Sequence, residues 1–322
     1  MFRQGSVARL LAQRVATSVL SLFIASIVIF LAGQLVPGDA ASYLLGKGAS
    51  PEQLAAARVS LHENDPAWAR YLSWTGHAVT GDFGRSLISG QPVWAELEPK
   101  LRNSMILAAV AGAFGLLLWN VLGCVAATAR GRLVDRAVGG FTLVTLAIPA
   151  FVVGGLLILC FALAIPLFPA TVTVSPDAPV LALLGSVWLP AVTIAITSAS
   201  YPTRTARAAV LDKLTSGSVE TARLRGLSPL PLTLRHVLPQ AAPAILTADA
   251  LVVGAFVGEM VVVETLFNYP GIGSYLVTAV GAHDLPVVQA TALLGTVAWI
   301  ITNLAADALS LVVNPRLRDG IR

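Results

Sequence analysis

Four acidic residues lie inside long apolar stretches of the sequence, where a charge is costly. Asp249, Glu259 and Glu264 fall in one stretch, and Asp307 falls in the last one. An ionisable side chain in such a place either hydrogen-bonds to a neighbouring helix or lines a hydrated pathway. We keep both roles open for each residue, and Glu259 is the strongest pathway candidate. Glu264 is expected near the end of its stretch, where solvation is cheap.

The sequence lacks the motifs of catalysis, phosphate binding and metal binding. It has no G-x-x-x-x-G-K-[ST] phosphate loop, and Gly46-Lys47-Gly48 is only a lone glycine pair. It has no H-E-x-x-H motif and no cysteine cluster, and its four histidines are scattered over loops. We therefore predict no catalytic residue, no metal site and no cofactor in this chain.

A short polar segment between two apolar stretches, 218–239, is built to present a compact surface. Helix formers follow Ser218, which can cap them, and Gly226 is well placed to end that helix. A second amphipathic run begins at Thr233 and is expected to end at Pro239. The pattern predicts a helix-turn-helix elbow that protrudes from a membrane surface and needs a soluble partner.

The composition is that of a membrane protein. The 322 residues are 56% hydrophobic and only 12% charged, whereas soluble domains carry roughly 25% charged residues. The net charge of +4 comes from short basic clusters between apolar stretches. Positive charge in such places sets membrane orientation, so we do not expect a nucleic acid as a partner.

Six stretches are apolar enough, and long enough at about 20 residues, to cross a bilayer as helices. Pro190 lies inside the fourth and is expected to kink it. The first is too long for a typical signal peptide and is expected to remain as a helix. The six stretches are Val15–Val36, Met105–Ala129, Gly139–Ile165, Leu181–Ser200, Pro243–Phe267 and Val287–Val313.

Basic residues alternate between the loops and predict the orientation. The short loops 166–180 and 268–286 contain no Lys or Arg. The positive-inside rule then places both termini and the elbow in the cytoplasm. The basic residues on the predicted cytoplasmic side are Arg3, Arg9, Arg14, Arg130, Arg132, Arg136, Arg204, Arg207, Lys213, Arg223, Arg225, Arg235, Arg316, Arg318 and Arg322.

The long loop 37–102 carries charge but is predicted to lie outside, because long loops translocate largely regardless of charge. Within it, Pro51–His62 is predicted to form a short capped helix and Pro66–Val79 an amphipathic one. Trp68, Tyr71 and Trp74 fall at helical spacing in the second. They are expected to pack on the membrane interface or in a small core of the loop, and docking of an outer partner is the alternative.

These observations predict an all-α polytopic membrane protein. The predicted domain division begins with residues 1–36, a cytoplasmic N-terminal segment with the first span. Residues 37–102 are predicted to form an extracytoplasmic loop domain. The membrane core is 103–313, with a cytoplasmic coupling loop at 201–242, and 314–322 form a cytoplasmic tail. A polytopic chain without an energy-converting motif but with a prominent knob indicates a transport pore driven by a separate subunit.

Several blocks of the sequence resemble one family. The elbow resembles the EAA loop of permease subunits of binding-protein-dependent ABC importers, in Glu220-Thr221-Ala222, in Gly226 and in Leu238-Pro239. The chain resembles more narrowly the first permease of the dipeptide, oligopeptide and nickel group. The blocks that carry this are Val36-Pro37-Gly38-Asp39, Asp65-Pro66, Tyr71, Trp74, the run 81–86, the run 261–267, Tyr269-Pro270-Gly271-Ile272-Gly273, the run 284–289 and the run 314–318.

The resemblance implies six transmembrane helices in a type I importer fold, a non-catalytic role and a place in a prokaryotic inner membrane. It implies a second homologous permease, two ATPase subunits that hold ATP and magnesium, and an extracytoplasmic binding protein. Peptides are the implied substrates. The residues implied to couple the chain to the ATPase are Glu220, Thr221, Ala222, Arg223, Gly226, Leu238 and Pro239.

The alternative function is that of a self-contained secondary transporter or channel. Such proteins commonly carry inverted repeats, interrupted helices or charged residues near the midplane of both halves. The acidic residues of this chain instead crowd into the fifth and sixth stretches. A membrane-embedded enzyme is a third alternative, for which no reactive cluster is evident.

Overall fold

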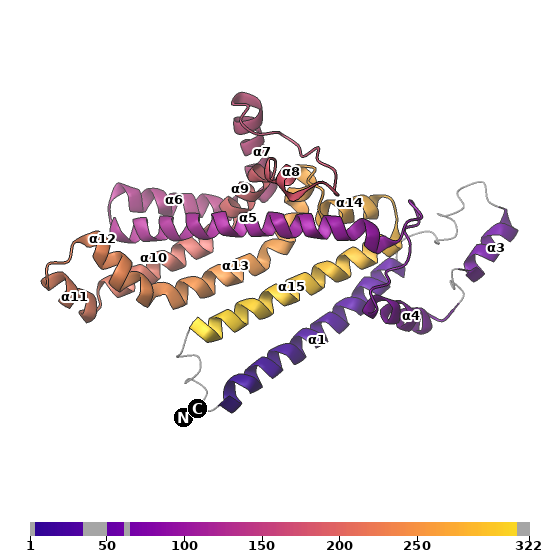
Figure 1. Cartoon of the computed structure of the whole chain (residues 1–322), viewed down its shortest axis with the longest axis horizontal. Coiled ribbons are helices and arrows are strands. Elements are labelled where there is room, and N and C mark those ends of the chain that lie inside the picture. Colours follow the sequence, from indigo (N-terminus) through magenta and orange to yellow (C-terminus); the bar gives the residue numbers. More distant parts are fainter. Residues whose placement is uncertain (1–3, 35–49, 61–64, 314–322) are drawn as a thin grey trace.

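A computed structural model of the chain describes residues 4–34, 50–60 and 65–313. Most of the helices form a bundle, and the short helix 51–60 lies apart from it (Figure 1). Two blocks of the family resemblance, 36–39 and 314–318, lie outside the described residues, as does the tail 314–322. The helices are α1 Gln4–Gln34, α3 Pro51–Ser60, α4 Ala67–Val79, α5 Val93–Thr128, α6 Leu133–Ala147, α7 Ala150–Ile158, η1 Leu159–Ala164, α8 Val180–Leu184, α9 Trp188–Thr197, α10 Ser200–Leu214, α11 Gly217–Leu224, α12 Pro229–Leu232, η2 Thr233–Val237, α13 Leu238–Leu266, α14 Ile272–Gly281 and α15 Leu285–Val313.

Four of the six predicted spans are long continuous helices. The apolar segments Ala12–Gln34, Val93–Thr128, Pro229–Leu266 and Leu285–Leu309 are each long enough to cross a membrane. Helices α6 and α7 with η1 make a fifth candidate only if a pair bent by 111° counts as one span. The described residues therefore hold four candidate spans, or five, and not six continuous ones.

The predicted third span, Gly139–Ile165, is wrong as a single helix. Ile148 is extended, with φ −96° and ψ 126°, and it separates α6 from α7. The cause is Pro149, which disfavours a helical conformation at the residue before it and has no N–H to continue the ladder.

The predicted fourth span, Leu181–Ser200, is also broken, into α8, α9 and the start of α10. The expected kink at Pro190 is absent, because α9 begins only two residues before it, at Trp188. In the first turn of a helix the missing N–H of proline would have had no helical partner, so it is tolerated there.

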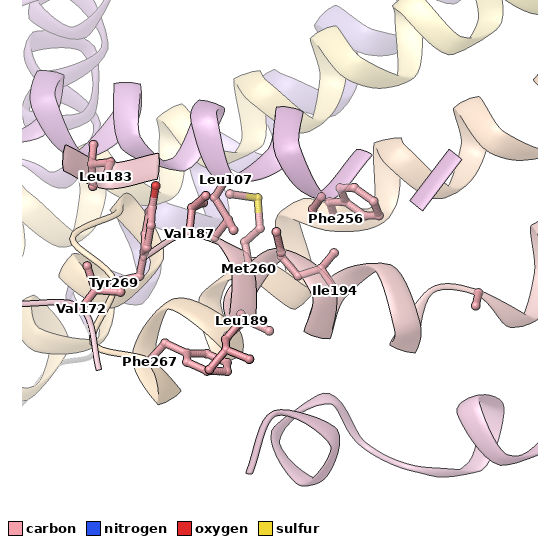
Figure 2. Close-up of a cluster of buried hydrophobic side chains, with 14 of the residues drawn as sticks. Leu107, Val172, Leu183, Val187, Leu189, Ile194, Phe256, Met260, Phe267 and Tyr269 are labelled. Atoms are coloured by element: carbon pink, nitrogen blue, oxygen red, sulfur yellow. The ribbon is translucent and has the colours of Figure 1, made fainter. Parts of the chain in front are cut away.

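The main core joins α5, α8, α9 and α13 with the segment after α13 (Figure 2). Trp119 of α5 is fully buried; its indole Nε1 donates to the Ala195 carbonyl at 2.7 Å, and its ring meets Phe256 edge to face. Because an indole N–H in an apolar core needs an acceptor, this bond fixes α5 against α9. Figure 2 shows Phe267 and Tyr269 in the same cluster as Leu107 and Met260.

Close packing in the bundle depends on glycines at two helix crossings. A Cβ on Gly123 of α5 would lie 2.6 Å from Ala206 Cβ of α10 and 2.9 Å from the Thr203 carbonyl oxygen. A Cβ on Gly154 of α7 would lie 2.5 Å from Leu266 Cδ2 at the end of α13. Small residues let helices approach closely where apolar lipid gives no hydrophobic drive to associate.

Helix α1 lies along α15 at the edge of the bundle (Figure 1). The exposed Arg14 and the half-buried Asp307 form an ion pair of 3.3 Å near one end of this pair of helices, and Gly33 faces Gln289 near the other. The two helices are therefore antiparallel. Much of the remaining surface of α1 is exposed and apolar, as expected for a span that faces lipid.

Both helices predicted in the segment after the first span are present, although the predicted end of the first, at 61–62, lies outside the described residues. Helix α3 starts with a reciprocal cap, in which Gln53 N donates to Ser50 Oγ and Ser50 N donates to Gln53 Oε1. Helix α4 places Tyr71 and Trp74 against Phe30 of α1. Trp68, which shares their predicted helical spacing, is instead exposed.

The packing at Gly123 generates a prediction. We expect Gly123→Ala to destabilise the chain by about 1–3 kcal/mol, because the added methyl group overlaps the backbone of α10. The measurement is the midpoint of thermal unfolding in detergent. Gly140→Ala in α6 is the matched control, since a Cβ there meets nothing within 4 Å. Equal midpoints for both variants would contradict this account of the crossing.

Candidate functional site

The elbow lies at the end of the bundle where α10 leaves it and α13 enters it (Figure 1). Helix α11 begins after Ser216, whose backbone is extended, with φ −75° and ψ 146°. The prediction that Ser218 caps the helix is therefore wrong: the capping position is Ser216, and Ser218 lies in the first turn. Gln240 Nε2 lies 3.3 Å from Ser218 Oγ and ties α11 to the start of α13.

Gly226 ends α11 as predicted. Its φ is +84°, a left-handed conformation that favours glycine. Gly226 N donates to the Arg223 carbonyl, and Leu227 N lies 3.4 Å from the Ala222 carbonyl. These two contacts form a Schellman motif, which satisfies the last carbonyls of the helix and turns the chain back sharply.

The second half of the elbow differs from the prediction. The amphipathic run does not end at Pro239, because α12, η2 and α13 form one helix from Pro229 to Leu266. Pro239 lies in the first turn of α13, directly after the wider turn η2. Pro239 cannot donate to the Arg235 carbonyl, and the wider turn lets the helix continue past its ring.

The two faces of α11 have different roles. Val219 and Ala222 are buried in a cluster with Ala206, Val210 and residues of η2 and α13. This cluster fixes the helix rigidly to the bundle. The other predicted coupling residues of α11 face solvent, and Leu238 is half-buried. The solvent-exposed members of the predicted set are Glu220, Thr221, Arg223, Gly226 and Pro239.

Sequence reasoning missed a group of exposed leucines on the elbow. Leu224 is 83% exposed, Leu230 is 68% exposed, and Leu227 and Leu234 are also exposed. Large apolar side chains that are exposed near a charged residue such as Arg223 are typical of surfaces that bind another protein. The signal was present in the sequence, because leucine recurs through a segment too polar to be a span.

An ion pair behind the elbow joins α6 to α10. Arg207 donates twice to Asp135, with Nε 2.6 Å from Oδ1 and Nη2 2.9 Å from Oδ2. Asp135 Oδ2 also accepts from the Gly131 backbone N–H, in the turn before α6. A bidentate arginine–carboxylate pair has fixed geometry, so this contact sets how α10 lies on α6.

Glu264 forms the most extensive polar contact of the four acidic residues. It is fully buried, so its predicted solvation is wrong. Its Oε1 accepts from Ser104 Oγ of α5 at 2.6 Å, and its Oε2 accepts from Gly273 N at 2.7 Å and Ser274 N at 3.2 Å. Those two N–H groups belong to the first turn of α14, where backbone donors have no partner within the helix and the dipole favours an acceptor oxygen.

Two glycines make room for this carboxylate. A Cβ on Gly271 would lie 2.3 Å from the Glu264 carboxyl carbon, and one on Gly273 would lie 2.7 Å from Val261 Cα. Ser104 completes the arrangement, because its hydroxyl oxygen also accepts from Ile272 N at 2.9 Å. The first three N–H groups of α14 are thus all satisfied.

A second layer of hydrogen bonds surrounds this point. Asn103 Nδ2 donates to the carbonyls of Pro176 and Pro270, and the Tyr269 hydroxyl donates to the Asn103 carbonyl. Arg102 donates to the carbonyls of Pro176 and Ala178. The connecting segments before α8 and α14 are thereby fixed to the start of α5.

A further polar contact joins α14 to α5. The Tyr275 hydroxyl hydrogen-bonds to the Glu96 carboxylate, and Lys100 Nζ lies 4.1 Å from the centroid of the Tyr275 ring. Burial, with the hydrogen bond to Glu96, raises the pKa of Tyr275, so the phenol keeps its proton. Protonation lets it remain the donor in this contact.

The other acidic residues have separate partners. Asp249 is buried in α13, and its Oδ2 accepts from Asn120 Nδ2 of α5 at 2.8 Å. Glu259 is half-buried and accepts from the hydroxyls of Thr197 and Ser198, where α9 meets α10. Asp307 makes the ion pair with Arg14 already described. The four acidic residues therefore do not converge on one site, and each contacts a neighbouring helix or helix junction.

A cavity of about 740 Å³ lies between α5, α13, α14 and α15. Its wall is mainly apolar, with a few hydroxyls from residues such as Thr291 and Thr296. Of the four predicted acidic residues, Glu264 alone belongs to the wall. Gly258 and Gly295 also line it and leave it wide. Such a cavity can admit a chain-like or apolar molecule but offers little charge.

A helical bundle with at least four apolar helices long enough to cross a bilayer defines a multi-pass membrane protein. The model of the family "Binding-protein-dependent transport system inner membrane component" matches residues 120–319. The model of the N-terminal part of such membrane components matches residues 7–107. The chain therefore belongs to this family of inner-membrane transport components.

Full-length relatives agree with this assignment. The glutathione transport system permease protein GsiC of Escherichia coli is 32% identical, over 92% of this chain and 95% of the relative. The probable peptide ABC transporter permease protein y4tP of Sinorhizobium fredii is 29% identical, over 95% of this chain and 98% of the relative.

The fold resembles a solved one. One chain in an inward-facing structure of the MetNI methionine ABC transporter superposes with a TM-score of 0.51 at 16% identity, over 68% of this chain and 96% of that chain. The protein is a multi-pass permease of an ABC importer in the inner membrane. It is a non-catalytic component without a cofactor of its own, and it works with a separate ATPase and a binding protein.

The contacts of Glu264 generate a prediction. We expect Glu264→Leu to lower stability by more than about 3 kcal/mol, since it leaves the Ser104 hydroxyl and two N–H groups of α14 buried without this acceptor. Glu264→Gln keeps one acceptor oxygen and should cost less. Thermal unfolding of the purified chain measures both. Glu98→Leu, at an exposed position of α5, is the control. The prediction fails if the Leu and Gln variants unfold together with wild type.

Proposed function

We propose that the chain is the first permease subunit of an importer for dipeptides or oligopeptides. It forms the translocation pathway with a second, homologous permease, and two ATPase subunits drive the pair. The support for a peptide-type substrate is that relatives matching nearly the full chain are named as peptide and glutathione permeases. Glutathione is itself a tripeptide, so both names describe one chemical class. Selectivity is proposed to rest largely with the extracytoplasmic binding protein.

The elbow is the proposed docking site for the ATPase. Glu220, Thr221 and Arg223 supply polar contacts, and the exposed leucines beside them supply apolar area. Ala222 anchors the helix to its own bundle, and Gly226 gives the sharp return. The observation that carries the proposal is this two-faced packing, because a helix fixed on one side transmits a displacement applied to the other.

The path from the elbow into the membrane is continuous. On one side α10 runs from the elbow to the α9–α10 junction, which is held by Glu259. On the other side the helix from Pro229 to Leu266 runs from the elbow to the contact of Glu264 with α14. Closure of the ATPases would then move both helices and rock the bundle between inward- and outward-open states.

We propose six crossings with both termini in the cytoplasm. The bent pair α6–α7 makes the third crossing, and α8, α9 and the start of α10 together make the fourth. The basic residues of the elbow support this orientation. The proposed parts are 1–36, the extracytoplasmic segment 37–102, the core 103–313 with the coupling loop 201–242, and the tail 314–322.

The cavity between α5, α13, α14 and α15 is the proposed share of this chain in the translocation pathway. Its weakly charged wall suits a permease that passes related peptides without holding any of them tightly. Among the acidic residues, Glu264 and Asp249 are proposed to hold helices together. Glu259 is proposed to position the α9–α10 junction, and Asp307 to hold α1 on α15.

The proposed docking site predicts the effect of two substitutions. We expect Glu220→Lys or Gly226→Pro to weaken capture of the tagged ATPase at least about tenfold, or about 1.4 kcal/mol. The first reverses a charge on the exposed face. The second cannot adopt a φ of +84° and lacks the N–H that bonds to Arg223. Co-purification from membranes, with substrate-stimulated ATP hydrolysis, provides the measurement.

Glu98→Lys is the matched control, because it makes the same charge reversal at an exposed position of α5, far along the chain from the elbow. It should retain the ATPase. Retention of the ATPase by both elbow variants at the wild-type level would refute the docking assignment. Loss with the control as well would assign the effect of Glu220→Lys to net charge, and Gly226→Pro, which changes no charge, would then carry the test alone.

A further inference from the structure

Helix α4 lies beside α1, and its contacts with α1 can be placed along that helix (Figure 1). The Tyr71 hydroxyl hydrogen-bonds to Ser26 Oγ at 2.8 Å, and the rings of Tyr71 and Trp74 pack on Phe30. Ser26 and Phe30 are both buried, although most of α1 is exposed. Helix α4 thus covers one side of the C-terminal part of α1.

These contacts lie within the apolar length of α1. The apolar segment of α1 ends at Gln34, and Ser26 precedes Gln34 by eight residues. At about 1.5 Å of rise per residue, Ser26 lies about 12 Å inward of that end and Phe30 about 6 Å inward. Tyr71 therefore reaches past the boundary of the span, and α4 lies at the depth where headgroups meet acyl chains.

A second apolar face of α4 is exposed. Trp68 is 68% exposed, Leu72 is 61% exposed and Val79 is 83% exposed. At 100° per residue these three side chains fall within about 40° of one another around the helix. Ser73 and His77, which hydrogen-bond to each other, lie on the other side. The helix therefore presents one aromatic and apolar face and one polar face.

We propose that the Trp68, Leu72 and Val79 face of α4 is inserted into the lipid leaflet at the C-terminal end of α1. Helix α1, on which α4 packs, itself exposes large apolar side chains such as Phe23 and Leu31. A tryptophan at that depth matches the aromatic belt of membrane proteins. The helix anchors the segment after the first span to the bilayer surface.

The charge of α4 limits which lipids it recognises. Arg70 is its sole Lys or Arg, and it has no acidic residue; Arg70 donates to Gln34 of α1. Anionic headgroups therefore gain little from this helix, and its affinity comes from apolar contact with acyl chains. The proposed partner is the acyl region of any fluid bilayer rather than a particular headgroup.

The test uses a spin label on the full chain reconstituted in phosphatidylcholine vesicles. Both native cysteines are first removed by Cys124→Ala and Cys160→Ser, and Leu72→Cys then carries the label. Collision of the label with oxygen, which partitions into acyl chains, is compared with collision with a water-soluble nickel complex. Ser73→Cys, on the polar face of the same turn, is the matched control, and Leu31→Cys on α1 calibrates lipid exposure.

We expect the ratio of oxygen to nickel collisions to be several-fold higher at position 72 than at 73, and close to that at 31. It should stay unchanged when phosphatidylglycerol replaces half of the lipid. Equal and high collision with nickel at 72 and 73 would place both faces in water and overturn the proposal. An immobilised label at 72 that meets neither reagent would show that protein covers the face, which also overturns it.

Discussion

The buried carboxylate of Glu264 is the interaction on which one end of the bundle depends. It joins α13, to which it belongs, with Ser104 of α5 and the first turn of α14. In an apolar surrounding, a carboxylate persists only if strong donors satisfy it. Backbone N–H groups at a helix start meet that need, and the space they require explains why Gly271 and Gly273 have no side chain. The Tyr-Pro-Gly-Ile-Gly block of the sequence thus forms the binding site for the carboxyl group of Glu264.

The opposite end of the molecule is organised by apolar packing instead. Val219 and Ala222 attach the elbow to α10 and α13, and the polar face beside them stays in solvent. Helices α10 and α13 lead from the elbow toward the other end. Side-chain contacts along them include Arg207 of α10 with Asp135 and Glu259 of α13 with Ser198. Each contact involves a helix junction or a helix start, so rigid helices meet at points where their directions can change.

Hydropathy predicted the long spans because an apolar run of sufficient length has few other stable forms in a membrane. It failed at the third and fourth spans, because mean hydropathy does not detect a break within an apolar run. Pro149 is the residue in the sequence that indicates the break in the third span. The terminator Gly226 was predictable from local backbone preference. The burial of Glu264 was not, because its donors come from Ser104, 160 residues away in sequence, and from the helix after it. The exposed leucines were not predictable from composition, because composition does not say which leucines of an amphipathic segment face solvent.

The boundary between the two matched family models lies within a single helix, α5. They cover residues 7–107 and 120–319, and both limits fall inside α5, which is unbroken from Val93 to Thr128. Modules of a protein are usually joined by loops, which tolerate insertions and deletions. A helical joint does not, since each added residue would turn one module by about 100° and shift it by about 1.5 Å relative to the other. During evolution, insertions and deletions should therefore be excluded from α5.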